Sequence, residues 1–131
     1  MIDLENMITI AKKTRMNSHS PYSNYKVGCA LLTKSGKIFS GCNIENDGLM
    51  SICAERVAFV KAISEGEKEF ECMVVCGGKD TKNLDDCLPC GYCRQFMSEF
   101  VKEKFNIYTV NNNNEITLYK IKDLLPYSFK M

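Results

Sequence analysis

Stretches with helical and extended patterns alternate along the middle of this sequence, and the alternation restricts the folds available to it. Helical patterns cover residues 53–63 and 89–102, and the apolar run between them, residues 71–76, is typical of a buried strand. Strands that alternate with helices form a sheet that is covered on both of its faces. We therefore expect an α/β fold with helices on both sides of a central sheet.

The flanking segments extend this architecture. An amino-terminal helix is expected over residues 2–18, and a β-hairpin with a short turn follows it. The expected strands span residues 27–33, 37–41, 71–76, 106–110 and 115–118, and a short helical piece precedes the carboxyl terminus. The sequence therefore predicts a three-layer α/β/α sandwich around a mixed sheet of about five strands.

Two residue types mark the expected ends of these elements. The strand 71–76 is expected to end at Gly77-Gly78, because glycine favours turns over strands. Proline suits the first position of a helix, so the second internal helix is expected to begin at Pro89. Cys53 begins the other internal helix. Both cysteine-bearing segments then begin helices at the same end of the sheet, where the binding sites of α/β proteins gather.

The length and composition fit one domain of an ordinary globular protein. The 131 residues are 45% hydrophobic and 25% charged, so residues 1–131 are expected to form a single domain. No run approaches the roughly 18 to 20 apolar residues of a membrane-spanning helix. The formal net charge is only +1, which disfavours an extensive contact with nucleic acid.

The amino-terminal segment and the cysteine content together predict a cellular location. Residues 1–15 place the charged side chains of Asp3, Glu5 and Lys12 among apolar ones, which differs from the apolar central region of a secretory signal. The eight cysteines are therefore expected to be reduced thiols rather than a secreted disulfide framework. We expect a cytoplasmic protein with no membrane or nucleic-acid partner.

The eight cysteines fall into two groups. Free cysteine is among the most buried residue types, and four of the eight are expected to be small core side chains: Cys29, Cys42, Cys72 and Cys76. The other four lie at or just before the starts of the two internal helices: Cys53, Cys87, Cys90 and Cys93. The second group is the candidate for chemistry.

Three cysteines of the second group have the spacing of a metal site. Cys90 and Cys93 lie on the first turn of one helix, where both thiols can face one ion, and Cys53 begins the other helix. Three protein ligands leave zinc with an open position for water, which is typical of catalytic sites. Glu55 adds a carboxylate two residues after Cys53. Arg56 is expected to offset the negative charge of three thiolates by donating hydrogen bonds to the sulfurs.

The cysteines alone leave other interpretations open. A fourth ligand at Cys87 would make a structural zinc site, but Cys87 precedes Pro89, so its thiol is expected to point away. The segment Cys87–Cys93 also has the spacing of an iron–sulfur motif, although Met97-Ser98 stand where that motif needs Cys and Pro. A redox dithiol would leave Cys53-Ala54-Glu55 without a role.

Motifs along nearly the whole chain resemble those of one family. The motifs are Pro21-Tyr22-Ser23, Val27-Gly28, Gly41-Cys42-Asn43-Ile44-Glu45-Asn46, Cys53-Ala54-Glu55-Arg56, Pro89-Cys90-Gly91-Tyr92-Cys93-Arg94-Gln95 and Leu124-Leu125-Pro126-Tyr127-Ser128-Phe129. In this order they resemble the small homotetrameric cytidine deaminases, a class of zinc enzymes that includes a three-cysteine variant. The resemblance implies hydrolysis of cytidine and deoxycytidine to the uridines and ammonia, as in pyrimidine salvage.

The resemblance also implies the catalytic and metal-binding roles. Cys53, Cys90 and Cys93 would hold one zinc ion per chain, which activates the water that attacks C4 of cytosine. Glu55 would carry protons from that water to N3 of the ring and then to the departing ammonia. Arg56 would neutralise charge beside the ligands.

Substrate contacts are implied by the same resemblance. Asn43 and Glu45 would bind the ribose hydroxyls, Tyr25 would pack near the base, and Ala54 would also contact the substrate. Phe129 would reach into the site of an adjacent subunit, so that a homotetramer shares its active sites between chains.

The sequence departs from the family pattern beside the expected site. The stretch 47–52 is one residue shorter than usual and lacks the common aromatic, Tyr92 replaces a small residue, and Leu88 replaces a serine. Blasticidin S deaminases and deaminases that act on nucleic-acid strands share the zinc motifs. The pair Asn43-x-Glu45 favours a free nucleoside, and the low net charge disfavours a nucleic-acid strand. A non-catalytic zinc-stabilised module is the alternative from another class, and Glu55 would be dispensable in it.

Overall fold

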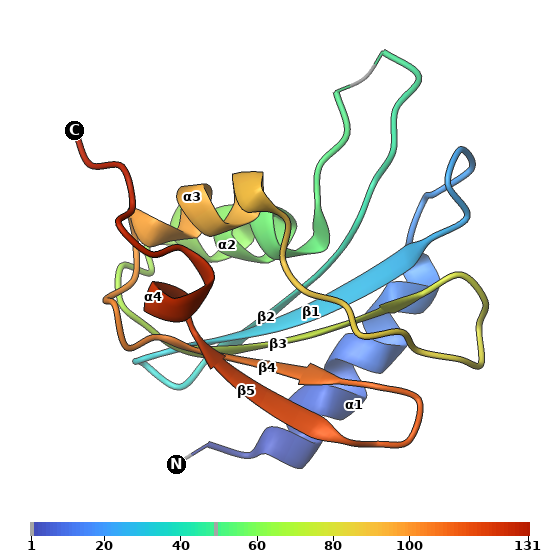
Figure 1. The fold of residues 1–131 in the computed structure, drawn as a ribbon, viewed down its shortest axis with the longest axis horizontal. Coiled ribbons are helices and arrows are strands. Elements are labelled where there is room, and N and C mark those ends of the chain that lie inside the picture. Colours follow the sequence, from blue (N-terminus) through green and yellow to red (C-terminus); the bar gives the residue numbers. More distant parts are fainter. Residues whose placement is uncertain (1, 49) are drawn as a thin grey trace.

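A mixed five-stranded sheet forms the centre of the protein (Figure 1). The computed structural model describes residues 2–48 and 50–131. The strands are β1 (Lys26–Thr33), β2 (Ile38–Cys42), β3 (Phe70–Gly78), β4 (Asn106–Val110) and β5 (Ile116–Lys120), in the order β2-β1-β3-β4-β5 across the sheet. Strands β3 and β4 are parallel and the other neighbours are antiparallel, so the expected mixed sheet is confirmed.

Helices cover both faces of this sheet. They are α1 (Leu4–Thr14), α2 (Ala54–Ser64), α3 (Gly91–Ser98) and α4 (Ile121–Leu124), with a 3₁₀ turn at Arg15–Asn17. Helix α1 lies on one face, and α2 and α3 lie on the other (Figure 1). The three-layer α/β/α sandwich is therefore confirmed. None of the helices in residues 2–48 and 50–131 is long and apolar enough to cross a membrane.

The residues of β3 show how the strand pattern specifies the layers. Cys72, Val74 and Cys76 are fully buried in the cluster beneath α1, whereas Met73 and Val75 are fully buried in the cluster beneath α2 and α3. Successive side chains of a strand point to opposite faces, so a strand that is buried on both faces is an uninterrupted apolar run. The apolar run Cys72–Cys76 is therefore explained by burial of both faces of β3.

Three of the four cysteines expected in the core are buried there. Cys29, Cys72 and Cys76 are fully buried, which confirms the expectation, and Cys42 is only partly buried. Burial raises the pKa of both Cys72 and Cys76 to about 11. These thiols are therefore neutral at physiological pH and serve as small apolar side chains.

The two glycines expected to end β3 are instead part of it. Gly77 and Gly78 pair with Val27 and Lys26 of β1. A Cβ atom on Gly77 would lie 2.8 Å from the sulfur of Cys87, so glycine is present because the packing is close and not because the strand turns. The expected strand end was therefore wrong.

The helix boundaries also differ from the expectation. Pro89 does not begin α3, because Cys90 occupies the capping position and its sulfur accepts a hydrogen bond from the amide of Cys93 at 3.5 Å. A helix start has free amide groups that a side-chain acceptor can satisfy, and proline has no such acceptor. Helix α3 ends at Ser98, about one turn earlier than expected, and α1 ends at Thr14.

Gly41 of β2 brings α2 into direct contact with the sheet. A Cβ atom at this position would clash with the carbonyl oxygen of Ala54 and would lie 2.7 Å from the amide nitrogen of Ala58. The first turn of α2 therefore lies against the backbone of β2. This contact sets the position of Cys53, which caps the helix, and of Glu55 in its first turn.

Candidate metal centre

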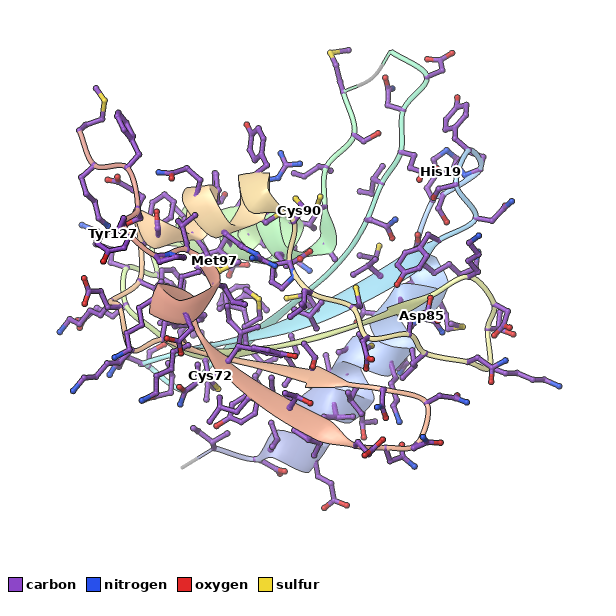
Figure 2. All side chains as sticks on the ribbon, viewed as in Figure 1. His19, Cys72, Asp85, Cys90, Met97 and Tyr127 are labelled. Atoms are coloured by element: carbon purple, nitrogen blue, oxygen red, sulfur yellow. The ribbon has the colours of Figure 1, made fainter. Side chains whose placement is uncertain are left out.

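Three thiols from two helix starts meet at one point. Cys53 caps α2, Cys90 caps α3, and Cys93 lies in the first turn of α3. The three sulfur atoms all lie within 4.8 Å of one another, with 3.8 Å between Cys53 and Cys90 and 3.5 Å between Cys90 and Cys93. Figure 2 places Cys90 at the start of α3, on the side of the sheet opposite to Cys72. The structure thus brings together the three cysteines that the sequence singled out as metal ligands.

The chain topology explains why the two helix starts coincide. Helix α2 precedes β3 and α3 precedes β4, and these two strands are parallel neighbours in the sheet. Both helices pack on the same face, so their amino ends lie at the same edge. The partial positive charge of a helix start favours thiolate over thiol, which suits cysteines that bind a cation.

The thiols also influence one another's protonation. A hydrogen bond from Cys93, together with one from Arg56, outweighs burial and lowers the pKa of Cys53 to about 5. The pKa of Cys93 is raised instead, because Cys93 keeps its proton in the hydrogen bond to Cys53 and because it is buried. One thiolate is therefore already favoured at neutral pH before any cation binds.

The donor set fits a zinc ion. Thiolate sulfur is a preferred zinc ligand, and three protein ligands leave one coordination position open. Cys90 is exposed, Cys53 is partly exposed and Cys93 is buried, so the cluster is open to solvent on the side of Cys90. An open position that solvent can reach is a feature of catalytic rather than structural zinc sites.

Cys87 lies outside this cluster, as expected. Its side chain is buried, and its sulfur lies next to Gly77 and interacts with the hydroxyl of Tyr25. Burial raises the pKa of Cys87 to about 12. A neutral buried thiol of this kind is a core side chain, and the four-cysteine structural site has no support from its position.

Arg56 stands beside the thiols, where it was expected to offset their charge. Its Nη2 lies 3.7 Å from the sulfur of Cys53 and 3.5 Å from the carbonyl oxygen of Ser51. The aromatic ring of Tyr92 covers the guanidinium group, with 4.2 Å between Cζ and the ring centroid. Burial alone would lower the pKa of Arg56, but hydrogen bonds to Cys53 and Cys93 outweigh it and raise the pKa.

Glu55 is a buried carboxyl group next to the cluster. Only 4% of its surface is exposed, and burial raises its pKa to about 7, with a further contribution from the nearby charge of Cys53. A carboxyl group with a pKa near neutrality can both accept and release a proton under physiological conditions. Its position two residues after the helix cap therefore combines a metal site with an acid–base group.

A pocket of about 260 Å³ opens beside Cys53. It is lined by Tyr22, Asn43, Glu45, Asn46, Ser51, Ile52 and Cys53. The pocket therefore joins Asn43 and Glu45, the two residues expected to bind a sugar, to one of the thiols. The sequence did not indicate Tyr22, Asn46, Ser51 and Ile52 as lining residues, although Tyr22 and Asn46 lie within the motifs Pro21-Tyr22-Ser23 and Gly41-Cys42-Asn43-Ile44-Glu45-Asn46.

Hydrogen bonds hold the two polar residues of this pocket in place. Oδ1 of Asn43 accepts from the hydroxyl of Ser18 at 2.6 Å and from the amide of Val27 at 2.9 Å. Nδ2 of Asn43 donates to the carbonyl oxygen of Tyr25 at 2.8 Å.

The carboxylate of Glu45 is held in the same way by the turn before β1. It accepts hydrogen bonds from the amides of Tyr22 and Ser23, and from the Ser23 hydroxyl. The hydroxyl of Ser23 and these amides lower the pKa of Glu45, so the group is ionised and oriented.

The other expected substrate contacts, Tyr25, Ala54 and Phe129, do not line this pocket. The ring of Tyr25 lies against Gly77 and interacts with Cys87, and burial raises its pKa. Ala54 is fully buried at the start of α2. Phe129 is 65% exposed in the carboxyl-terminal tail, where its carbonyl oxygen accepts from Nε2 of Gln95 at 3.1 Å.

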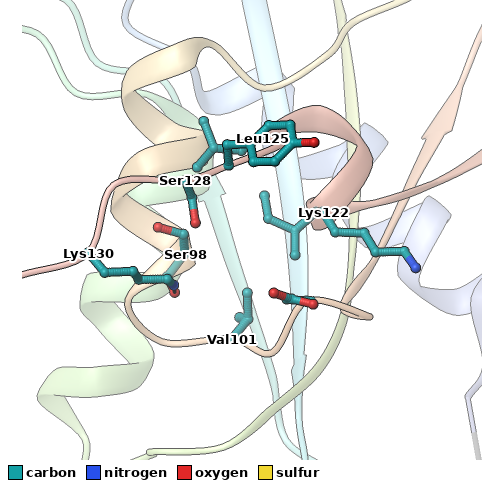
Figure 3. Close-up of a pocket in the computed structure, with 9 residues that line it drawn as sticks. Ser98, Val101, Lys122, Leu125, Ser128 and Lys130 are labelled. Carbon is teal, nitrogen blue, oxygen red and sulfur yellow. Dashed lines mark hydrogen bonds between the residues drawn. The ribbon is translucent and has the colours of Figure 1, made fainter.

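A second and larger pocket of about 390 Å³ lies near the carboxyl terminus (Figure 3). Its lining residues come from the end of α3, from α4 and from the tail, and they include Ser98, Ile121, Leu125, Tyr127 and Lys130. None of the residues expected at the site lines this pocket. The cluster of thiols, and not the volume of a pocket, therefore identifies the candidate site.

Comparison with known proteins identifies the family of this chain. The family described as "Cytidine and deoxycytidylate deaminase zinc-binding region" matches residues 1–109. The cytidine deaminase of Sporosarcina psychrophila is 40% identical over 129 residues, which are 98% of this chain and 92% of that protein. A probable cytidine deaminase of Dictyostelium discoideum is 46% identical over 128 residues, covering 97% of this chain and 84% of that protein.

A solved structure and a more distant relative complete the comparison. The crystal structure of cytidine deaminase from Burkholderia pseudomallei matches with a TM-score of 0.88 and 37% identity, and the match covers 98% of this chain and 100% of that one. The blasticidin-S deaminase of Bacillus cereus is 30% identical over 112 residues, which are 82% of this chain and 79% of that protein.

Proposed function

The chain belongs to the family of zinc-dependent cytidine and deoxycytidylate deaminases, and on that basis we propose how its residues perform the reaction. The reaction is the hydrolysis of the amino group at C4 of cytidine, which gives uridine and ammonia. The observation that carries the proposal is the cluster of three thiols at two helix starts, with the buried carboxyl group of Glu55 beside it.

The zinc ligands are Cys53, Cys90 and Cys93. When bound, zinc lowers the pKa of a water molecule and so supplies a nucleophile at neutral pH. Three thiolates and one divalent cation carry a net charge of about −1, which makes the water less acidic. Arg56 reduces this effect, because its guanidinium group lies 3.7 Å from the sulfur of Cys53.

Glu55 carries the protons of the reaction. It takes one proton from the attacking water and delivers it to N3 of the cytosine ring. It then moves the second proton to the departing amino group, which leaves as ammonia. A pKa of about 7, caused by burial, allows the same group to act as base and as acid near neutral pH.

The nucleoside lies in the pocket beside Cys53. Asn43 and Glu45 bind the ribose hydroxyls, since both line the pocket and both are held by hydrogen bonds that fix their orientation. Tyr25 and Ala54 contact the cytosine base. The pair Asn43 and Glu45 suits cytidine and deoxycytidine, and an analogue such as blasticidin S is the second candidate substrate because a deaminase of that compound is a relative.

A homotetramer with shared sites completes the pocket. Ligand pockets typically measure about 300 to 1,000 Å³ and enclose most of the ligand. The pocket beside Cys53 measures only about 260 Å³ and is open, so one chain encloses little of a nucleoside. The exposed side chain of Phe129 is available to cover the base in a neighbouring subunit.

The same reasoning extends to the setting of the enzyme. We propose that residues 1–131 form one deaminase domain, since one continuous sheet contributes to both core clusters. Zinc ligation requires reduced thiols, which supports a cytoplasmic location. Conversion of cytidine to uridine, with release of ammonia, is a step of pyrimidine salvage.

The proposal is tested by mixing purified protein with cytidine and following the loss of cytidine absorbance. The matched control is Glu55→Gln, which removes the proton carrier and leaves the three thiols. We expect turnover by the native chain, a loss of about 10² to 10⁴ in rate or more for the variant, and one zinc ion per chain in both. Deoxycytidine and blasticidin S are assayed in parallel. A variant as active as the native chain would refute the role of Glu55, and turnover of blasticidin S alone would replace the proposed substrate.

A further inference from the structure

Tyr92 stands between two zinc ligands and connects the two helices of the site. It follows Cys90 and Gly91 in the first turn of α3, and its ring covers the guanidinium group of Arg56, which belongs to α2. The side chain of Tyr92 is 66% exposed, so the ring is not placed there by burial in the core. Its ring contacts Arg56 instead.

The ring of Tyr92 covers one face of the Arg56 guanidinium group. Nη2 of Arg56 is directed at the sulfur of Cys53 and at the carbonyl oxygen of Ser51, and Nε is buried with no hydrogen-bond acceptor among the described residues. The ring of Tyr92 lies over the face of the guanidinium group at 4.2 Å.

We propose that Tyr92 is a positioning residue that holds Arg56 against the ligand sulfurs and thereby slows the loss of zinc. The proposal rests on the proposed function in one respect, that zinc is held by Cys53, Cys90 and Cys93. A cation over an aromatic face is attracted by the ring, and the attraction increases where water is excluded. With the ring in place, the positive charge stays next to the thiolates, whose combined charge exceeds that of the zinc ion.

Substitutions of Tyr92 can distinguish the contribution of its aromatic ring from those of its hydroxyl group and of its packing. An aromatic ring without the hydroxyl keeps the attraction, so Tyr92→Phe should behave as the native chain. A side chain without a ring loses it, so Tyr92→Leu and Tyr92→Ala should release zinc faster. Leu88, on the other side of Cys90, is 40% exposed and provides a matched control as Leu88→Ala.

The experiment measures zinc rather than turnover. Each purified, zinc-loaded protein is mixed with a chelator that changes absorbance when it binds zinc, and both the release rate and the zinc affinity by competition are recorded. Exposed cation–aromatic contacts correspond to changes of about two- to five-fold. We expect an increase of that size in the release rate for Tyr92→Ala and Tyr92→Leu, and no change for Tyr92→Phe or Leu88→Ala.

A second pair of variants identifies Arg56 as the residue through which Tyr92 acts. Arg56→Gln alone should release zinc faster than the native chain, and adding Tyr92→Ala to Arg56→Gln should have no further effect. An equal effect of Tyr92→Ala in both backgrounds would overturn the proposal, as would a native release rate in Tyr92→Ala. A native chain that binds no zinc would instead refute the proposed function, so the two failures are distinguishable.

Discussion

The hydroxyl of Ser18 donates to Oδ1 of Asn43 at 2.6 Å, and the same oxygen accepts the amide of Val27. Asn43 is thus connected to the end of the first helical segment and to β1 at once. One hydrogen of its Nδ2 is used by the carbonyl oxygen of Tyr25, and the second has no acceptor among residues 2–48 and 50–131, so it is available to a ligand. The residue proposed to bind ribose is oriented by its own chain before any substrate arrives.

Removal of the Ser18 hydroxyl should therefore weaken substrate binding. Ser18→Ala leaves Asn43 with one fewer partner, and we expect a few-fold higher KM for cytidine and a loss of about 1 kcal/mol in the free energy of unfolding. The matched control is Ser35→Ala, which removes a hydrogen bond to Glu67 in the hairpin turn. Steady-state kinetics and urea denaturation of both variants check this. An unchanged KM in Ser18→Ala would show that Asn43 is positioned by its other partners.

Glu45 provides a prediction about pH. Its pKa is lowered by the Ser23 hydroxyl and by the amides of residues 22 and 23. A lowered pKa in the folded state stabilises the fold above the pKa of the unfolded chain, and this contribution is lost as the pH falls through the folded-state value. The difference in unfolding free energy between the native chain and Glu45→Gln should be constant above about pH 5 and should shrink below it. Denaturation curves recorded over this range measure the difference.

Ser23→Ala is the control for this pH effect. It removes the largest cause of the lowered pKa but keeps the Glu45 carboxyl group. The acid-dependent loss of stability attributable to Glu45 should therefore be smaller in the Ser23→Ala background. An identical loss in both backgrounds would show that the hydroxyl does not orient the carboxylate.

The cysteines should separate into ligands and core residues by their zinc content. Cys53→Ser and Cys90→Ser each remove a thiol from the cluster of three, so we expect both variants to lose zinc. Cys87→Ser should keep about one zinc ion per chain, since Cys87 is buried beside Gly77 and Tyr25. Metal analysis of the three purified variants is sufficient. Loss of zinc from the Cys87 variant would replace the three-ligand site with a four-ligand one.

The carboxyl-terminal tail should act on a neighbouring subunit. Deletion of residues 129–131 removes Phe129 and should raise the KM for cytidine while zinc content stays unchanged. Mixed with an inactive Glu55→Gln chain of full length, the truncated chain should regain activity, because a mixed tetramer can place an intact tail beside an intact zinc site. Light scattering gives the oligomeric state. A fully active truncated monomer would exclude shared sites.

Gly41 should not tolerate a larger side chain. In Gly41→Ala the new methyl group meets the backbone of Ala54 and Ala58, neither of which can rotate away. We expect a loss of about 1 to 3 kcal/mol in the free energy of unfolding. Gly91→Ala is the matched control, because no atom beyond its chain neighbours and its own helix backbone lies within 4 Å of its Cβ position. Equal stability of the two variants would show that α2 can move away from β2 without cost.

The fold was predictable wherever burial alone decides the pattern. The run Cys72–Cys76 is apolar without interruption because α1 covers one side of β3 and α2 covers the other. The ends of elements were not predictable from local preferences. Gly77-Gly78 stay in β3 because β1, which is distant in the sequence, pairs with both of them and because Cys87 packs on Gly77. Local propensity is a weak guide where such contacts compete with it.

The metal ligands were predictable from the sequence, but the residues that orient the site were not. Two short motifs specify the thiols, since each motif begins a helix and the helix starts lie at one edge of the sheet. The support of Asn43 was not visible, because its partners Ser18 and Val27 lie 25 and 16 residues away. The contact of Tyr92 with Arg56 joins two helices and likewise has no sequence signal. Residues that orient a site are harder to recognise than residues that form it, because their role depends on the tertiary structure.

The contact between Gly41 and α2 divides the site into a part that can diverge and a part that cannot. A helix that touches the sheet backbone has no room to shift, so the positions of Cys53 and Glu55 relative to the sheet are inherited with the fold. Within residues 2–48 and 50–131, the three atoms nearest to a Cβ at Gly41 all belong to α2, and none comes from the connection between β2 and α2 or from the carboxyl-terminal tail. During evolution, new substrate ranges should therefore arise from substitutions and length changes in those two segments, while the chemistry of deamination stays the same.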